Sequence, residues 1–169
     1  MEWNDIYDEN RNRIGRHLRG TPLGEGEYLF AVCVWVYDGR GRILLTRRAP
    51  EKSFAGTWEN SGGAALAGED SLTAVVRELF EETGIRAKPE QFRFLRTTKS
   101  KNGFFDHYCL QWDGVIEDIV LQPGETDGVR WCDFDQIHQL IREGAICSII
   151  ANQFLMEEPT LRRLSGMDS

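Results

Sequence analysis

Three glutamates lie close together in one short segment of the chain. Glu78, Glu81 and Glu82 are spaced i, i+3 and i+4, so on a helix their side chains project from the same face. Like charges at this spacing repel one another and weaken the helix, and a bound cation removes that cost. Clustered carboxylates without Cys or His partners suit a hard ion such as Mg²⁺ or Mn²⁺. A solvated acidic helix face with no chemical role is the other interpretation.

The residues beside this cluster fit a metal site. Gly63, next to Gly62, allows a backbone carbonyl to approach the same ion, because glycine has no Cβ. Arg77 precedes Glu78 and is placed to pair with an acid such as Glu69, which would hold the preceding loop against the helix.

A helix over residues 71–83 would bring the glutamates together. Its apolar residues recur at three- and four-residue spacing, the pattern of a helix with one buried face; they are Leu72, Val75, Val76, Leu79 and Phe80. Ser71 is the expected N-cap, and Gly84 is typical of a helix C-terminus.

The other expected elements are short strands and two C-terminal helices. An N-terminal hairpin and its following loop occupy residues 1–27, with arms at 3–7 and from 13 to 15. Further strands are expected at 28–37, 42–48, 91–99, 105–112 and 128–133, and helices at 134–142 and 146–156, with Pro159 ending the second. A helix among short, largely hairpin-linked strands predicts a mixed α/β fold.

Composition limits the class of partner. The chain has 169 residues, of which 41% are hydrophobic, so residues 1–169 are expected to form a single domain with a real core. The net charge of −7 argues against binding to nucleic acid or to an anionic membrane, because both rest on basic clusters. The four cysteines form no CxxC pair, and the first residues contain no secretory signal, so a cytoplasmic location is expected.

Residues 63–85 resemble, without departure, the Nudix box of the Nudix hydrolase superfamily. The matching positions are Gly63, Glu69, Arg77, Glu78, Glu81, Glu82 and Gly84, with Leu79 and Ile85 at the aliphatic positions. The resemblance implies an α/β/α sandwich with a mixed sheet, in which the box forms a loop, a helix and a second loop. It also implies a pyrophosphatase that hydrolyses the diphosphate linkage of a nucleoside diphosphate joined to another group.

The resemblance assigns roles to the box residues. Glu78, Glu81 and Glu82 match the family's metal-binding glutamates, and carbonyl oxygens near Gly63 would complete a Mg²⁺ or Mn²⁺ site. Arg77 and Glu69 match the pair that orients the helix. The general base in this family is either a box glutamate or an acid on a later loop, for which Glu125 and Asp127, just before the last expected strand, are candidates.

Residues outside the box are candidates for substrate binding. Arg47 and Arg48 end a strand near the expected site and could contact a phosphate, while Phe105 could stack on a base. Aromatic residues in strands are more often part of the core. The expected partner is a small diphosphate molecule, and the sequence leaves open a homodimer that uses the N-terminal hairpin.

The N-terminal part resembles the isopentenyl diphosphate isomerase-like Nudix proteins more closely, in residues 5–10, 44–49 and 58–61. A true isomerase of that type needs a cysteine directly after the Trp-x-Asn-Ser stretch, where this chain has Gly62 and Gly63. The family's metal-binding histidines are also missing from residues 25–30. A hydrolase is therefore favoured, with an isomerase and a non-catalytic ligand-binding Nudix domain as the alternatives.

Overall fold

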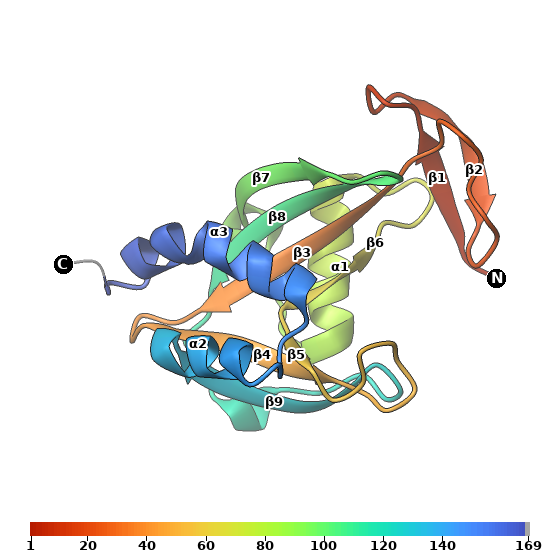
Figure 1. The fold of residues 1–169 in the computed structure, drawn as a ribbon. Coiled ribbons are helices and arrows are strands. Elements are labelled where there is room, and N and C mark those ends of the chain that lie inside the picture. Colours follow the sequence, from red (N-terminus) through yellow and green to blue (C-terminus); the bar gives the residue numbers. More distant parts are fainter. Residues whose placement is uncertain (168–169) are drawn as a thin grey trace.

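The computed structural model describes residues 1–167 and contains two sheets (Figure 1). The smaller sheet is an antiparallel hairpin of β1 (Trp3–Tyr7) and β2 (Arg13–Leu18), which projects from one end of the molecule. The larger sheet has the order β5-β4-β3-β8-β7, with β6 paired to β3 and β9 paired to β4. Its strands are β3 (Leu29–Tyr37), β4 (Arg42–Arg48), β5 (Trp58–Glu59), β6 (Ser61–Ala64), β7 (Arg93–Lys99), β8 (Gly103–Gln111) and β9 (Thr126–Asp133).

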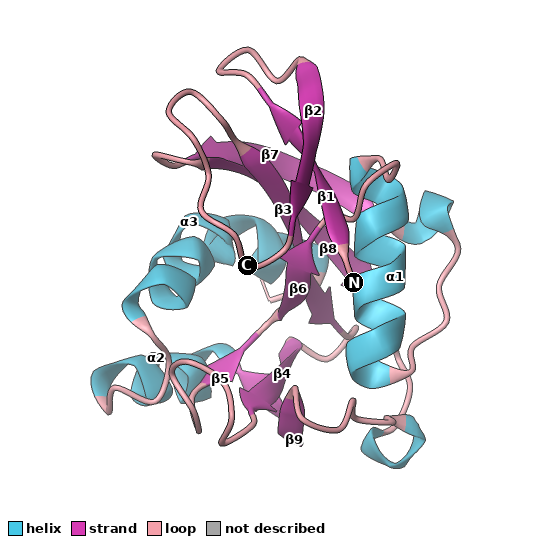
Figure 2. Cartoon of the chain, turned by 90° about the vertical axis from the view of Figure 1, so that its right-hand side faces the viewer, coloured by secondary structure: helices cyan, strands magenta, loops and turns pink. Residues whose placement is uncertain are grey.

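Helices cover both faces of the larger sheet (Figure 2). Helix α1 (Ser71–Thr83) lies on one face, and α2 (Phe134–Arg142) and α3 (Ser148–Leu164) lie on the other. Alternate residues of β3 enter two separate cores: Val34 packs with α1, and Trp35 packs with α2 and α3. Strand β3 is therefore buried on both faces, as its nearly continuous apolar sequence requires. This arrangement confirms the predicted α/β sandwich with a mixed sheet, since β3 and β8 pair in parallel while the other pairs are antiparallel.

Helix α1 has the predicted bounds, but Ser71 is not its N-cap. Asp70 takes that position with an extended backbone, and its carboxylate accepts a hydrogen bond of 2.7 Å from the N–H of Thr73. Ser71 is instead the first helical residue, with its hydroxyl 2.7 Å from that of Tyr108. Gly84 ends the helix with a φ of 74°, a left-handed conformation that glycine adopts without steric cost.

The prediction that Pro159 ends the last helix is wrong. Helix α3 continues through Pro159 to Leu164, although proline has no N–H to donate to the preceding turn. Phe154 and Leu161, which are both fully buried, fix the helix to the core on either side of the proline, so tertiary packing outweighs the local penalty. Strand bounds elsewhere shift by a few residues: the hairpin's second arm runs 13–18, and the strands expected from 91, 105 and 128 begin at 93, 103 and 126.

The hairpin is bonded to the segment between β6 and α1, residues 65–70, called here the box loop. Three hydrogen bonds join them: from Asn4 Nδ2 to the Ala65 carbonyl at 2.7 Å, from the Ala67 N–H to the Trp3 carbonyl at 2.8 Å, and from the Gly68 N–H to Asp5 Oδ2 at 2.7 Å. Tyr7 and Tyr28 also exchange two backbone hydrogen bonds, which extends the contact to the start of β3. The hairpin therefore has a fixed position beside the box.

A further ion pair links the hairpin turn to β8. Arg11 donates two hydrogen bonds to the buried carboxylate of Asp106, which also accepts one of 2.7 Å from the Thr97 hydroxyl. Burial by itself would raise the pKa of Asp106, but the hydrogen bonds from Arg11 and Thr97 hold it below its usual range. A carboxyl group with a lowered pKa stabilises the fold above its unfolded pKa, and this stability is lost as the pH falls through the folded value.

We expect Arg11→Ala to reduce the free energy of unfolding by about 2 kcal/mol at pH 7, because it leaves Asp106 buried without its cation. Well below the unfolded pKa of Asp106, near 3.8, the difference from the parent protein should largely disappear. Thermal denaturation at pH 7 and at a pH well below 3.8 measures the loss of stability under both conditions. Lys101→Ala, in an exposed loop, is the control for the lost positive charge. An equal destabilisation of Arg11→Ala at acid and neutral pH would contradict this account.

No helix within residues 1–167 combines the length and the apolar character that crossing a bilayer demands.

Candidate active site

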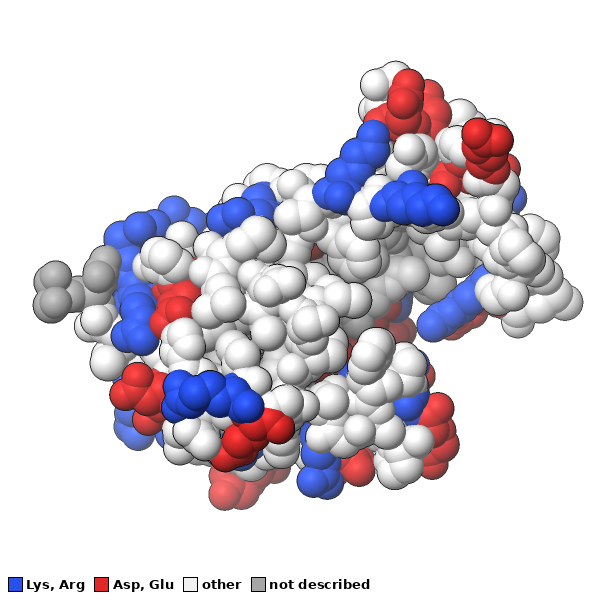
Figure 3. Space-filling model, in the orientation of Figure 1, with Lys and Arg blue, Asp and Glu red and all other residues white. Residues whose placement is uncertain are grey.

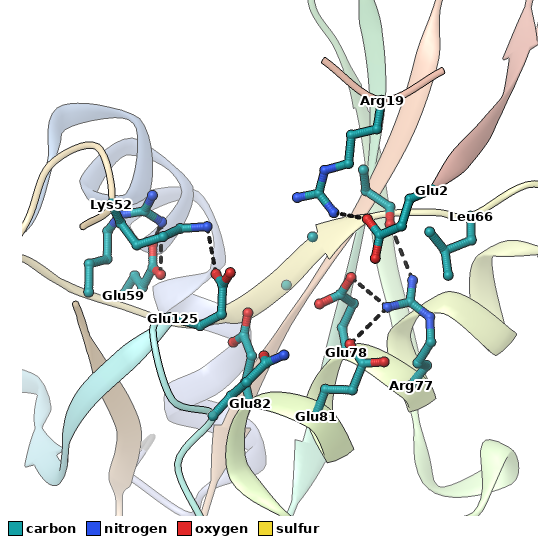
Figure 4. Close-up of a pocket in the computed structure, with 15 residues that line it drawn as sticks. Glu2, Arg19, Lys52, Glu59, Leu66, Arg77, Glu78, Glu81, Glu82 and Glu125 are labelled. Carbon is teal, nitrogen blue, oxygen red and sulfur yellow. Dashed lines mark hydrogen bonds and ion pairs between the residues drawn. The ribbon is translucent and has the colours of Figure 1, made fainter. Parts of the chain in front are cut away.

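The three box glutamates line a pocket of about 260 Å³ between β6, α1 and the N-terminal hairpin. Figure 3 shows a recess below the hairpin with acidic and basic side chains around it, and Figure 4 shows the side chains that line the pocket. Its charged residues are Glu2, Arg19, Arg48, Lys52, Glu59, Arg77, Glu78, Glu81, Glu82 and Glu125. The pocket therefore holds six carboxylates against four cations.

Arg77 connects the box loop to α1, called here the glutamate helix because it carries Glu78, Glu81 and Glu82. Its Nε and Nη2 donate to the two carboxylate oxygens of Glu69 at 2.7 and 2.9 Å, a fork-to-fork pairing that fixes both groups. Glu69 also accepts a hydrogen bond of 2.8 Å from the Leu66 N–H. Arg77 Nη2 donates a further hydrogen bond of 3.2 Å to the Ala64 carbonyl. Burial by itself raises the pKa of Glu69, but these hydrogen bonds keep it below its ordinary value. These contacts thus fix the box loop to the helix.

The same guanidinium also contacts two of the glutamates. Arg77 Nη1 lies 2.9 Å from Glu78 Oε1 and 3.1 Å from Glu81 Oε2. Burial raises the pKa of Glu78, and Arg77 only partly opposes that effect. One nitrogen therefore holds both carboxylates. Within residues 1–167, no three Asp, Glu, His or Cys side chains lie close enough together to form a metal-binding group by themselves.

Glu82 differs from its neighbours because no cation faces it. Its side chain is buried, and its Oε2 has no hydrogen-bond partner among the described residues. Burial, followed by the charges of Glu78 and Glu59, raises the pKa of Glu82 well above its usual value. An unpaired buried carboxylate is costly unless a cation compensates it, so the site fits a bound metal ion.

Gly63 adds a second sign of a metal site. A Cβ built on Gly63 would lie 2.5 Å from Glu78 Oε1 and 2.6 Å from Glu78 Cδ. Only glycine therefore lets the Glu78 carboxylate approach the backbone of β6 so closely. Glu78, Glu82 and a β6 carbonyl beside Gly63 could hold a hard cation with oxygen ligands alone, which is the donor set that Mg²⁺ or Mn²⁺ prefers.

The predicted substrate arginines have different positions. Arg48 lines the pocket and places its Nη1 at 3.0 Å from both carboxylate oxygens of Glu59. Arg47 does not line the pocket: it pairs with Asp127 at 2.7 Å, and its guanidinium lies 5.6 Å from the centre of the Trp58 ring. The alternation of a strand sends successive side chains to opposite faces, so only one of two adjacent arginines can face the site.

Glu125 lines the pocket on the side opposite Glu2 and Arg19, with its Oε2 2.6 Å from Lys52 Nζ (Figure 4). Sequence reasoning did not identify Lys52, Glu59, Glu2 or Arg19. No local signal marks them, because each reaches the pocket through contacts between segments far apart in the sequence.

Phe105 lies in a second pocket of about 290 Å³, on the other side of β6 from the glutamates. The two pockets share Arg48, Glu59 and the β6 backbone. Two buried amide atoms of the second pocket, Asn60 Nδ2 and Gln153 Oε1, have no hydrogen-bond partner among residues 1–167. An apolar lining with a few unsatisfied polar atoms is typical of a ligand pocket.

Two sequence relatives match most of the chain. A protein of Listeria monocytogenes described as an uncharacterized Nudix hydrolase is 30% identical over 146 residues, which is 85% of this chain and 86% of the relative. An isopentenyl-diphosphate Delta-isomerase of Pectobacterium atrosepticum is 30% identical over 139 residues, covering 79% of this chain and 78% of the relative.

Solved structures with similar folds include a protein of Deinococcus radiodurans, with a TM-score of 0.70, 23% identity, and coverage of 85% of this chain and 90% of that one. A bifunctional NMN adenylyltransferase/ADP ribose pyrophosphatase of Francisella tularensis, in complex with AMP and a Mn ion, has a TM-score of 0.62 and 18% identity, over 79% of this chain and 42% of that one. The family model for the NUDIX domain matches residues 27–148, which include the whole box and the glutamate helix. Together with the relatives, this match shows that the chain belongs to the Nudix family.

Proposed function

We propose that this chain is a metal-dependent diphosphohydrolase that cleaves the diphosphate linkage of a nucleoside diphosphate joined to another group. The observation that supports it most is the buried carboxylate of Glu82, whose Oε2 has no hydrogen-bond partner among the described residues, beside Glu78 and Gly63 in one pocket. Enzymes of the Nudix family generally use divalent metals. The Francisella relative in fold is named as an ADP ribose pyrophosphatase and was solved with a Mn ion.

In this proposal Glu78 and Glu82, with Glu81 and a carbonyl near Gly63, hold Mg²⁺, for which Mn²⁺ is the alternative. Such a cation, when bound, neutralises charge on the phosphates and lowers the pKa of a coordinated water. The two hydrogen bonds between Arg77 and Glu69 hold the glutamate helix in a fixed position against the box loop.

Glu125 is the proposed general base. Lys52 holds its Oε2, so Oε1 is the oxygen that takes a proton from the attacking water. The water oxygen forms a bond to one phosphorus, and the bond from that phosphorus to the bridging oxygen breaks. The leaving phosphate departs with the electron pair, and two phosphate products result.

The second pocket is the proposed site for the group beyond the diphosphate. Phe105 offers an aromatic face, and the amides of Asn60 and Gln153 offer a donor and an acceptor to a planar polar group. Arg48 lines both pockets and is therefore proposed to contact the phosphate nearest that group.

A substrate panel tests this proposal. We expect turnover of at least one of ADP-ribose, NADH, nucleotide sugars, dinucleoside polyphosphates, coenzyme A or oxidised nucleotides with Mg²⁺ or Mn²⁺, and none with EDTA. Reaction in ¹⁸O-labelled water should place the label in one phosphate product. Absence of hydrolysis across the panel with both metals would overturn the proposal.

An isomerase remains the second candidate, because a relative that covers most of the chain carries that name. Cys33 lies opposite Gly62 in the pairing of β3 and β6, next to the position where a true isomerase needs its cysteine. Burial raises the pKa of the Cys33 thiol to about 12, although Asn60 opposes this effect, so the thiol is poorly suited to proton transfer at neutral pH. Isopentenyl diphosphate belongs in the same panel, with double-bond migration as the readout.

A further inference from the structure

The N-terminal hairpin supplies part of the pocket wall although it lies outside the matched family domain. The family model begins at residue 27, whereas Glu2 and Arg19, which flank β1 and β2, both line the glutamate pocket. In Figure 4 they reach toward the pocket from the side opposite Lys52 and Glu125, with Glu78 below. The hydrogen bonds between hairpin and box loop fix this wall in relation to the glutamates.

The four cations of the pocket are not equally available to an anionic ligand. Arg77 is mostly buried and is divided among Glu69, Glu78, Glu81 and a carbonyl. Arg48 is 19% exposed and is held by Glu59, which is itself mostly buried. Removing either arginine from its partner would leave a carboxylate buried without compensation, which is costly. Each can therefore contact a ligand only while it keeps that partner.

Arg19 is held much more weakly. It pairs only with Glu2 among the described acids, and the side chains of Arg19 and Glu2 are 58% and 52% exposed. Ion pairs in solvent contribute little to stability, because water screens the attraction. Exchange of Glu2 for a phosphate therefore costs the fold almost nothing, and the planar guanidinium can donate two hydrogen bonds to phosphate oxygens.

We propose that Arg19 is a substrate-binding residue. It contacts the phosphate group that lies farther from Arg48, and it breaks its ion pair with the competing anion Glu2 when the diphosphate binds. This inference rests on the proposed function, since it assigns one end of the same diphosphate. The diphosphate would then lie between two arginines, Arg48 from β4 and Arg19 from the hairpin, above the glutamates.

Calorimetric titration with methylenediphosphonate and Mg²⁺ tests the proposal without turnover. We expect Arg19→Ala to weaken binding at least tenfold, and Arg19→Lys to restore part of it. Arg16→Ala is the matched control: Arg16 lies on the same hairpin with a similar exposure of 59%, but it faces Asp5 and lines a different pocket. It should bind as the parent protein does.

Glu2→Gln distinguishes binding from a structural role. If Arg19 binds phosphate, loss of its competitor tightens binding, so the two substitutions act in opposite directions. If the pair only supports the hairpin, both weaken binding alike, and the proposal is overturned. It is equally overturned if the parent protein does not bind the probe or if Arg19→Ala leaves binding unchanged. Binding that depends on Arg19 in a protein that hydrolyses nothing would sustain this inference while the proposed hydrolase fails.

Discussion

Glu82→Gln should lower turnover of the diphosphate substrate by about 10³-fold and should raise the stability of the protein in EDTA. The loss of activity follows from replacing an anionic oxygen ligand by a neutral amide in the proposed metal site. The gain in stability follows from removing a buried charge that lies near Glu78 and Glu59 and whose Oε2 has no hydrogen-bond partner among the described residues, and it should amount to roughly 1–3 kcal/mol.

The pH dependence of this gain has a definite sign. The pKa of Glu82 is raised by burial and by Glu78 and Glu59, so its protonated form favours the folded state. Its contribution is fully present below the unfolded pKa, near 4.5, and is lost as the pH rises through the folded value. The stability advantage of Glu82→Gln in EDTA should therefore grow with pH.

Steady-state kinetics and thermal denaturation in EDTA measure the two effects of Glu82→Gln. Glu81→Gln is the matched comparison, because Glu81 is 40% exposed and already faces Arg77; its stability in EDTA should change little. A Glu82→Gln variant with near-normal turnover would contradict the proposed role of this carboxylate.

Replacing either of the adjacent glycines of β6 by alanine should have a different effect: Gly63→Ala should reduce turnover, and Gly62→Ala should reduce stability. In Gly63→Ala, the new Cβ meets the Glu78 carboxylate, which is the end of a flexible side chain and can move away. Turnover should fall by about 10²-fold, because Glu78 leaves its position, while the fold loses little stability. In Gly62→Ala, the Cβ would lie 2.3 Å from the Val32 carbonyl oxygen and 2.9 Å from Cys33 Cα.

That contact in Gly62→Ala is with the backbone of β3, which cannot yield without disrupting the sheet. We expect a loss of roughly 1–3 kcal/mol in the free energy of unfolding. Each variant serves as the control for the other, since both add one methyl group to neighbouring residues of one strand. Comparison of kcat with the denaturation midpoint separates the outcomes, and equal losses of stability in both variants would falsify this distinction.

Local sequence patterns were sufficient for the glutamate helix and for most strands. The spacing of Leu72, Val75 and Leu79 defines α1, because the pattern and the packing agree. The sequence does not distinguish the N-cap, because Asp70 and Ser71 are both good capping residues and the backbone conformation decides between them. Strand β6 was not predicted, since glycines disfavour strands in general; here they are required because β3 approaches too closely for a side chain at Gly62.

The candidate site could be predicted only where it lies within one segment. The box fixes Glu69, Arg77 and the three glutamates in a span of 23 residues, so spacing alone brings them together. By contrast, the positions of Lys52, Glu59 and Arg19 depend on how separate loops and the hairpin dock. No sequence signal separates Arg47 from Arg48. Only the orientation of β4 in the sheet decides which of the two side chains faces the pocket.

The anchoring of the hairpin also has a consequence for the order of folding. Its bonds from Asn4 to Ala65 and from Arg11 to Asp106 join residues that are 61 and 95 positions apart. Contacts across such long separations close late, because the entropy of a large loop is lost before they form. During synthesis the hairpin emerges before β8, so it must wait for β8 to leave the ribosome before the bond from Arg11 to Asp106 can form. The pocket wall that contains Arg19 is therefore expected to be completed after the glutamate helix, although the hairpin is synthesised before that helix.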